Sequence, residues 1–86
     1  MLIQKKIVPL LVPDIGEPDK IELVQWNIKE GDIVKEGQEL CELVTSKASF
    51  PLESPFEGRI IKIHKQEGET VQIGEELAII EISISS

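Results

Sequence analysis

An internal repeat is the feature that most restricts how this chain can fold. Residues 30–40 read EGDIVKEGQEL and residues 67–77 read EGETVQIGEEL, so six of eleven positions recur after 37 residues. A stacked solenoid needs about three repeats or more, so two copies predict a closed domain with quasi-two-fold symmetry. The 86 residues suffice for one small domain, expected to span 1–86 with its core at about 7–82.

Both copies show the same order of short strands and glycine turns. The expected strands, in equivalent pairs, are 24–28 and 61–63, short pieces centred on Val34 and Val71, and 40–44 and 77–82. The 14 Ile and 6 Val against 2 Ala favour strands over helices, because β-branched side chains fit a pleated surface. Alternation in the first strand predicts that Val24, Trp26 and Ile28 share one face.

Two further strands are expected outside the repeat, at 7–12 and 48–52. Each contains a proline, Pro9 or Pro51, which has no N–H for a ladder, so both are predicted to lie at sheet edges. Together with the repeat this makes seven or eight strands and no helix. The sequence therefore predicts an all-β fold, a flattened β-barrel or sandwich.

Composition excludes several functions. A net charge of −7 argues against a nucleic-acid partner, because a phosphate backbone attracts a basic surface. One Cys and one His exclude an internal disulfide and a zinc site. No apolar run approaches the roughly 18 residues of a membrane span, and the first residues do not resemble a signal peptide. With no nucleophile–base constellation and no phosphate loop, the chain is expected to be an intracellular, non-catalytic domain with no metal.

The residues most suggestive of chemistry are Thr45-Ser46-Lys47-Ala48. This short polar step separates two apolar strands, so it predicts a hairpin with Lys47 at its tip. The second copy has no equivalent, since Ile84 stands 37 residues after Lys47. A lysine offers a primary amine on a flexible stem and is a common target of covalent modification. A lysine at a hairpin tip would be accessible to a modifying enzyme.

Five stretches, in this order along the chain, resemble lipoyl domains of 2-oxo acid dehydrogenase acyltransferases. They are Val12-Pro13-Asp14-Ile15-Gly16-Glu17, residues 24–34, Leu40-Cys41-Glu42-Leu43, Thr45-Ser46-Lys47-Ala48-Ser49 and residues 54–60. The fourth resembles the family's lipoylation turn. The resemblance covers about residues 7–82, nearly the whole chain.

The resemblance implies a flattened barrel of two four-stranded sheets, with the modified lysine on a tight turn and both termini at the far end. It implies lipoic acid joined to Lys47 as an amide by a lipoate ligase or lipoyl transferase. The arm would then serve a thiamine-dependent 2-oxo acid decarboxylase, the acyltransferase core and dihydrolipoyl dehydrogenase. Such a domain is a monomeric carrier and no enzyme by itself. The bacterial cytoplasm is the expected compartment, with the mitochondrial matrix as an alternative.

The resemblance also implies partner recognition close to the turn. The residues expected to share in it are Thr45, Ser46, Ala48, Asp14 and Glu17. Ser46 departs from the family, which usually has Asp before the lysine, and this bears on partner recognition more than on attachment. The loop 14–20 is expected to lie near the turn.

Three alternatives remain open. Biotinyl domains share the fold but have Met on both sides of their lysine, where this chain has Ser46 and Ala48. An unmodified hammerhead module of a transport protein would make Lys47 incidental. The lipoyl carrier of glycine cleavage is usually longer and has helices that this sequence does not predict.

Three other residues have structural interpretations. Trp26 is expected in the core because it lies on an apolar alternation. Cys41 is expected to be a small buried apolar residue rather than a redox thiol. His64 continues an apolar strand on its polar side and is expected to face solvent.

Overall fold

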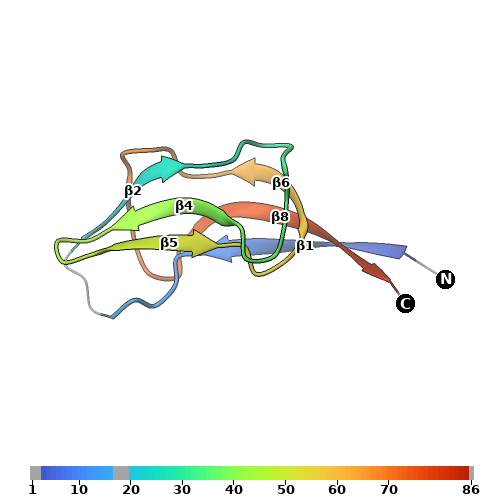
Figure 1. Cartoon of the computed structure of the whole chain (residues 1–86), viewed down its shortest axis with the longest axis horizontal. Helices are drawn as coiled ribbons and strands as arrows, with labels where there is room; N and C mark the ends of the chain where they lie inside the picture. The colour runs from blue at the N-terminus through green and yellow to red at the C-terminus, as the bar shows by residue number, and fades with distance from the viewer. Residues whose placement is uncertain (1–2, 17–19, 86) are drawn as a thin grey trace.

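The computed structural model describes residues 3–16 and 20–85, which form eight β-strands and no helix (Figure 1). The strands are β1 Ile3–Leu11, β2 Ile21–Trp26, β3 Ile33–Val34, β4 Glu39–Val44, β5 Ser49–Glu53, β6 Gly58–Ile63, β7 Thr70–Val71 and β8 Glu76–Ser85. The prediction of an all-β fold with seven or eight strands is confirmed.

The strands make two four-stranded antiparallel sheets. One has the order β1-β8-β6-β3 and the other the order β5-β4-β2-β7. The proline-containing strands β1 and β5 are both edge strands, as predicted from Pro9 and Pro51. Among the described residues no helix is long and apolar enough to cross a membrane.

The two sheets repeat each other at the level of individual residue pairs. Leu23 pairs with Leu43 in one sheet, and their equivalents 37 positions later, Ile60 and Ile80, pair in the other. Register shifts also recur at equivalent places, between Leu23 and Gln25 and between Ile60 and Lys62. The 37-residue repeat in sequence is therefore a two-fold repeat in structure.

The register shift corrects one detail of the expected pattern. Unbroken alternation would place Val24 on the inward face with Trp26 and Ile28. A bulge inserts an extra residue into one strand and changes which side chains face inward beyond it. As a result Leu23 is fully buried and Val24 is only half-buried, whereas Ile28 is buried as expected.

Two apolar clusters form the core, and five of the seven residues in each have their 37-residue equivalent in the other. One contains Leu10, Ile28, Val34, Leu40, Ile60, Ala78 and Ile80, and the other Val12, Ile21, Leu23, Cys41, Leu43, Val71 and Leu77. Trp26 is half-buried and packs against both clusters. Trp26 therefore connects the two clusters, although it is less buried than the core position predicted from sequence.

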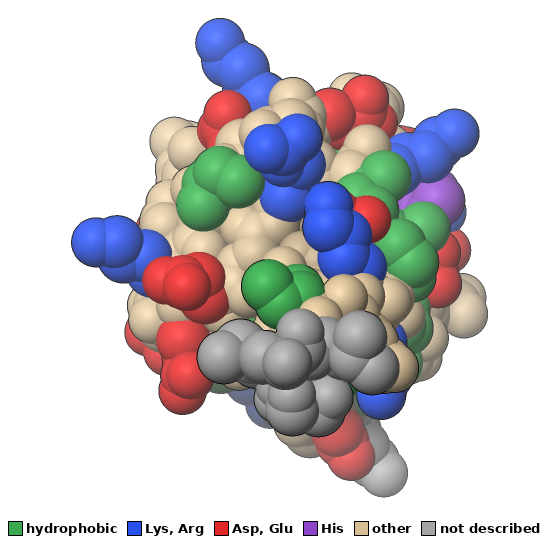
Figure 2. Space-filling view, turned by 90° about the vertical axis from the view of Figure 1, so that its right-hand side faces the viewer, with side chains coloured by type: hydrophobic (Ala, Val, Ile, Leu, Met, Phe, Trp, Pro, Cys, Tyr) green, Lys and Arg blue, Asp and Glu red, His purple; other side chains and the backbone are tan. Residues whose placement is uncertain are grey.

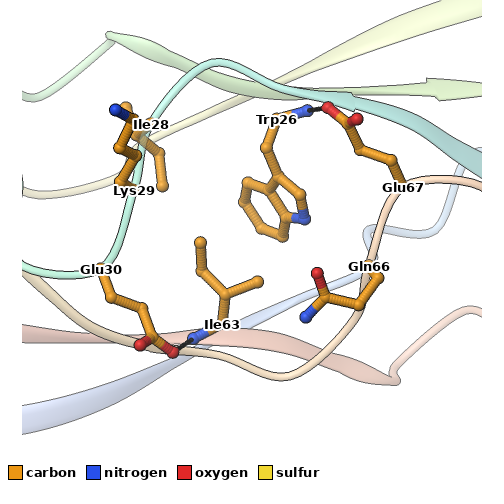
Figure 3. A pocket seen from close by; sticks show the side chains of 7 residues that line it. All are labelled: Trp26, Ile28, Lys29, Glu30, Ile63, Gln66 and Glu67. Atoms are coloured by element: carbon orange, nitrogen blue, oxygen red, sulfur yellow. Dashed lines mark hydrogen bonds between the residues drawn. The ribbon is translucent and has the colours of Figure 1, made fainter.

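The repeated glutamates connect the two copies of the repeat, which are called the two halves from here on. The Glu67 carboxylate accepts a hydrogen bond from the backbone N–H of Trp26 at 2.8 Å, and the Glu30 carboxylate accepts one from the backbone N–H of Ile63 at 2.9 Å. These contacts are equivalent under the repeat. Figure 3 shows both, with the side chains of Trp26 and Ile63 directed toward one another across a hollow between the halves. Glu30 and Glu67, the first residues of the repeated segments, are thus explained by structure rather than by acid–base chemistry.

The molecule is elongated, with principal extents of 49 × 22 × 18 Å. Both described chain ends lie at one end of the long axis and the β4–β5 hairpin lies at the other (Figure 1). Figure 2, which views the end near the termini, shows apolar side chains scattered among Lys, Arg, Asp and Glu. Exposed residues of the β1–β8 ribbon include Ile3, Ile7 and Ile84.

Candidate attachment site

The candidate site is the tip of the β4–β5 hairpin. β4 and β5 pair antiparallel up to Val44 and Ser49, and residues 45–48 connect them. Lys47 is exposed at this tip, at the end of the molecule opposite the termini (Figure 1). Sequence analysis predicted this placement of Lys47.

Hydrogen bonds within four residues define the shape of the turn. The Thr45 N–H donates to the Ala48 carbonyl oxygen at 2.8 Å. The Thr45 hydroxyl oxygen accepts the N–H groups of Lys47 and Ala48, each at 3.2 Å, and donates to the Ala48 carbonyl oxygen at 3.3 Å. The side chain of Thr45 is therefore bonded to the backbone of the lysine at the tip.

No ion pair joins Lys47 to a carboxylate of the described residues, whereas Lys5 and Lys65 each have such a partner. The Lys65 amine lies 2.7 Å from the Glu75 carboxylate, and this hydrogen bond is the main cause that raises the pKa of Lys65 and lowers that of Glu75. Lys47 instead is exposed to solvent. Its position suits formation of a stable amide with a carboxylic acid.

A shallow hollow lies directly beside the turn. Its lining residues are Lys20, Glu22, Val44, Thr45 and Ser46. Glu22 and Val44 are paired across β2 and β4, and Lys20 immediately precedes β2. Sequence analysis placed Thr45 and Ser46 at this site, and Lys20 only as the end of a nearby loop. Glu22 was missed, because no local signal reveals which residue pairs with Val44.

The loop that precedes β2 contains another predicted residue. Asp14 is exposed, and its carboxylate accepts the Gly16 N–H at 3.1 Å, where Gly16 has φ 103°. This is an Asx-type turn, so Asp14 has a local structural role besides the predicted one in partner recognition. Glu17 lies outside the described residues. Ser46 and Ala48 are exposed on either side of Lys47.

The remaining chemically versatile residues are not part of this tip. Cys41 is fully buried, and burial, with a smaller contribution from Glu39, raises the pKa of its thiol to about 12. It occupies the position equivalent to Ala78 of the other half, in agreement with a packing role. His64 is exposed, as expected, with its Nε2 at 2.6 Å from the Glu76 carboxylate. His64 directly follows β6 and Glu76 begins β8, both strands of the sheet that does not carry Lys47.

Two equivalent β-units with an exposed lysine at the tip of the β4–β5 hairpin would suit a domain that carries a covalently attached group. The family model described as "Biotin-requiring enzyme", which covers biotin and lipoyl attachment, matches residues 8–80. The chain belongs to this family.

Three proteins with similar sequences are acyltransferase components of dehydrogenase complexes. The chain is 40% identical over 72 residues to a lipoamide acyltransferase component of branched-chain alpha-keto acid dehydrogenase complex from Pseudomonas putida, covering 83% of this chain and 17% of that protein. It is 44% identical over 68 residues to a dihydrolipoyllysine-residue acetyltransferase component of pyruvate dehydrogenase complex from Acholeplasma laidlawii, covering 78% and 12%. A succinyltransferase component of 2-oxoglutarate dehydrogenase complex from Rickettsia bellii is 39% identical over 71 residues, covering 81% and 18%. The chain thus spans less than a fifth of these relatives.

Proposed function

We propose that this chain is a lipoyl carrier domain with lipoic acid attached as an amide to Lys47. The observation that carries the proposal is the exposed lysine at the third position of a side-chain-braced turn, at the far end of the molecule from the termini. The similarity to lipoamide and dihydrolipoyllysine acyltransferase components supports lipoate over biotin. Ser46 and Ala48 support the same choice, because biotinyl domains resemble this one but flank their lysine with Met.

The domain's contribution to this function is to position Lys47 and the arm attached to it. When bound, lipoate supplies a dithiolane that carries acyl groups and electrons. The β4–β5 hairpin places Lys47 at the end of the molecule opposite the described chain ends, so the arm can extend into solvent. Attachment to a common scaffold makes successive transfers effectively intramolecular, which raises the local concentration of the arm at each active site. The catalytic groups belong to the partners.

The proposed partners are a lipoate ligase or lipoyl transferase, a thiamine-dependent 2-oxo acid decarboxylase, an acyltransferase core and dihydrolipoyl dehydrogenase. The exposed surface next to Lys47 is the proposed docking area, comprising Ser46, Ala48 and the hollow lined by Lys20 and Glu22. We propose a bacterial cytoplasm as the compartment, with the mitochondrial matrix as the alternative, since relatives include bacterial and mitochondrial proteins.

Intact mass spectrometry after incubation with a lipoate ligase, ATP and lipoate tests the proposal. The expected result is one lipoyl-sized increment on the wild type, located at Lys47 by peptide mapping. Lys47→Arg keeps the charge and is expected to receive none, whereas Lys62→Arg, the matched control at another exposed lysine, is expected to be modified like the wild type.

Lipoylated domain should then be reductively acylated by decarboxylases for pyruvate, 2-oxoglutarate and branched-chain 2-oxo acids, tested side by side. Acylation by at least one decarboxylase is the expected result. Lipoate on a residue other than Lys47, or no lipoate on the folded wild type, would refute the proposal. Biotin on Lys47 with biotin ligase, or no modification by either ligase, would favour the biotinyl carrier or the unmodified structural module respectively.

A further inference from the structure

Resting on the proposed function, we propose that the Thr45 hydroxyl is the positioning group for the attachment lysine. In this role it holds the tip turn in the conformation that the modifying enzyme binds. Thr45 would then act on Lys47 through the backbone and would not contact the reacting atoms.

Four other turns in the molecule share a different construction. Residues 29–32, 35–38, 66–69 and 72–75 each have a glycine at the third position with φ between 84° and 94°. In each, the N–H of the fourth residue donates to the carbonyl oxygen of the first, and the side chain of the fourth accepts the N–H of the first. The positive φ of glycine makes this arrangement possible without steric cost.

The tip turn 45–48 carries Lys47 where those turns have glycine. No non-glycine residue among those described has a positive φ, so Lys47 does not adopt the glycine conformation. Residues 45–48 instead form a four-residue connection between β4 and β5, a loop length that is most often built around a type I turn with negative φ at its central residues. The tip turn is therefore built differently from the four glycine turns.

Thr45 supplies the hydrogen bonds that distinguish the tip turn. In an ordinary four-residue turn the fourth N–H bonds the first carbonyl oxygen, whereas here the Ala48 N–H bonds the Thr45 hydroxyl at 3.2 Å. The same hydroxyl bonds the N–H of Lys47, also at 3.2 Å. A threonine hydroxyl that bonds nearby backbone groups in this way acts as a local turn template.

Loss of the hydroxyl would lower the fraction of the domain whose tip turn has the conformation that the ligase binds. If loss of the hydroxyl leaves the tip in the competent conformation only part of the time, the apparent affinity for the ligase falls by that fraction. Each hydrogen bond shifts such an equilibrium by about two- to tenfold. We therefore expect KM for the domain to rise about tenfold while kcat stays within twofold, because the bound turn presents the same amine.

Three variants test this role. Thr45→Val has nearly the shape of threonine but no hydroxyl, and Thr45→Ser keeps the hydroxyl without the methyl group. Thr70→Val is the matched control, because Thr70 is the other threonine of the chain, lies exposed in β7 and makes no side-chain hydrogen bond among the described residues. For each, KM and kcat of lipoyl transfer are measured together with amide hydrogen exchange at Lys47 and Ala48.

The expected result is a tenfold higher KM and faster exchange at Lys47 and Ala48 for Thr45→Val, with Thr45→Ser and Thr70→Val within about threefold of the wild type. A general loss of stability would lower the concentration of folded domain but would leave the KM of the folded domain unchanged, so it would not reproduce this result. Wild-type kinetics in Thr45→Val, an equal loss in Thr45→Ser, or a loss confined to kcat would overturn the inference and leave the proposed function standing. A folded wild type that is not lipoylated at Lys47 would overturn both.

Discussion

Replacing Trp26 by alanine tests whether the two halves depend on a shared side chain. Trp26 packs against both core clusters, and its indole Nε1–H donates to the Lys65 carbonyl oxygen at 2.8 Å. The residue equivalent under the repeat is Ile63, which faces it across the hollow (Figure 3). Trp26→Ala therefore removes apolar contacts to both halves together with one hydrogen bond between them.

The expected cost follows from this environment. An aromatic side chain buries about 150–250 Å² when enclosed, so the half-buried Trp26 contributes roughly 100–150 Å². At about 25 cal/mol per Å² this burial stabilises the fold by about 3 kcal/mol, and the indole hydrogen bond adds about 1 kcal/mol. We expect Trp26→Ala to lower the free energy of unfolding by about 4 kcal/mol, a large part of the total for a small domain.

Urea unfolding followed by far-ultraviolet circular dichroism measures this loss without relying on the fluorophore that is removed. With an m-value of about 1 kcal/mol/M, the midpoint should fall by about 4 M or the variant should be unfolded in buffer. Ile3→Ala is the control, since Ile3 at the start of β1 is 68% exposed and its truncation should change stability by about 0.5 kcal/mol or less. Wild-type tryptophan emission should shift to longer wavelength across the same transition.

A loss below about 1 kcal/mol for Trp26→Ala would refute this reasoning, because neither half would then depend on the ring. A native emission spectrum equal to that of the unfolded chain would refute it independently.

Two further predictions follow from other contacts. Gly58→Ala should destabilise the fold by about 1–3 kcal/mol or more in urea, because the new Cβ would collide with the Glu81 carbonyl oxygen; an unchanged midpoint would contradict the close approach of β6 and β8. The Cys41 thiol, with its pKa raised to about 12, stays protonated in the folded state, while the unfolded thiol ionises near pH 8.5. Its contribution to stability is therefore complete below about pH 8.5 and is lost as pH rises toward 12; Cys41→Ala should remove this part of the alkaline loss in urea titrations, and equal alkaline slopes in the two proteins would disprove it.

Much of the fold could be predicted because its information is local or periodic. The repeat predicted two equivalent halves, and the missing N–H groups of Pro9 and Pro51 predicted the edge strands. Lys47 was placed at a hairpin tip because a polar step of four residues separates two apolar strands. These signals depend on residue type and spacing, which can be read without knowing what each strand contacts.

The details that escaped prediction depend on contacts between distant segments. The bulge that buries Leu23 in place of Val24 is defined by pairing with β4, and apolar alternation is equally compatible with an unbroken strand. Glu22 joins the hollow near the turn through the same pairing. The positioning role of Thr45 did leave a signal, since a threonine two residues before a tip residue can form a side-chain turn, but the glycine turns elsewhere were needed to interpret it.

The structure also changes which observation supports Lys47 as the attachment site. Its hairpin is absent from the second half, which could suggest a feature added for function. However, the edge strand β5 follows its neighbour β4 after four residues, whereas its equivalent β1 precedes β8 by most of the chain. Only one of these two equivalent strand pairs can be joined by a short turn, so chain connectivity alone explains the asymmetry. The argument for attachment at Lys47 therefore depends on how that turn is built: a lysine replaces the glycine of the four other turns, and the Thr45 hydroxyl stabilises its backbone.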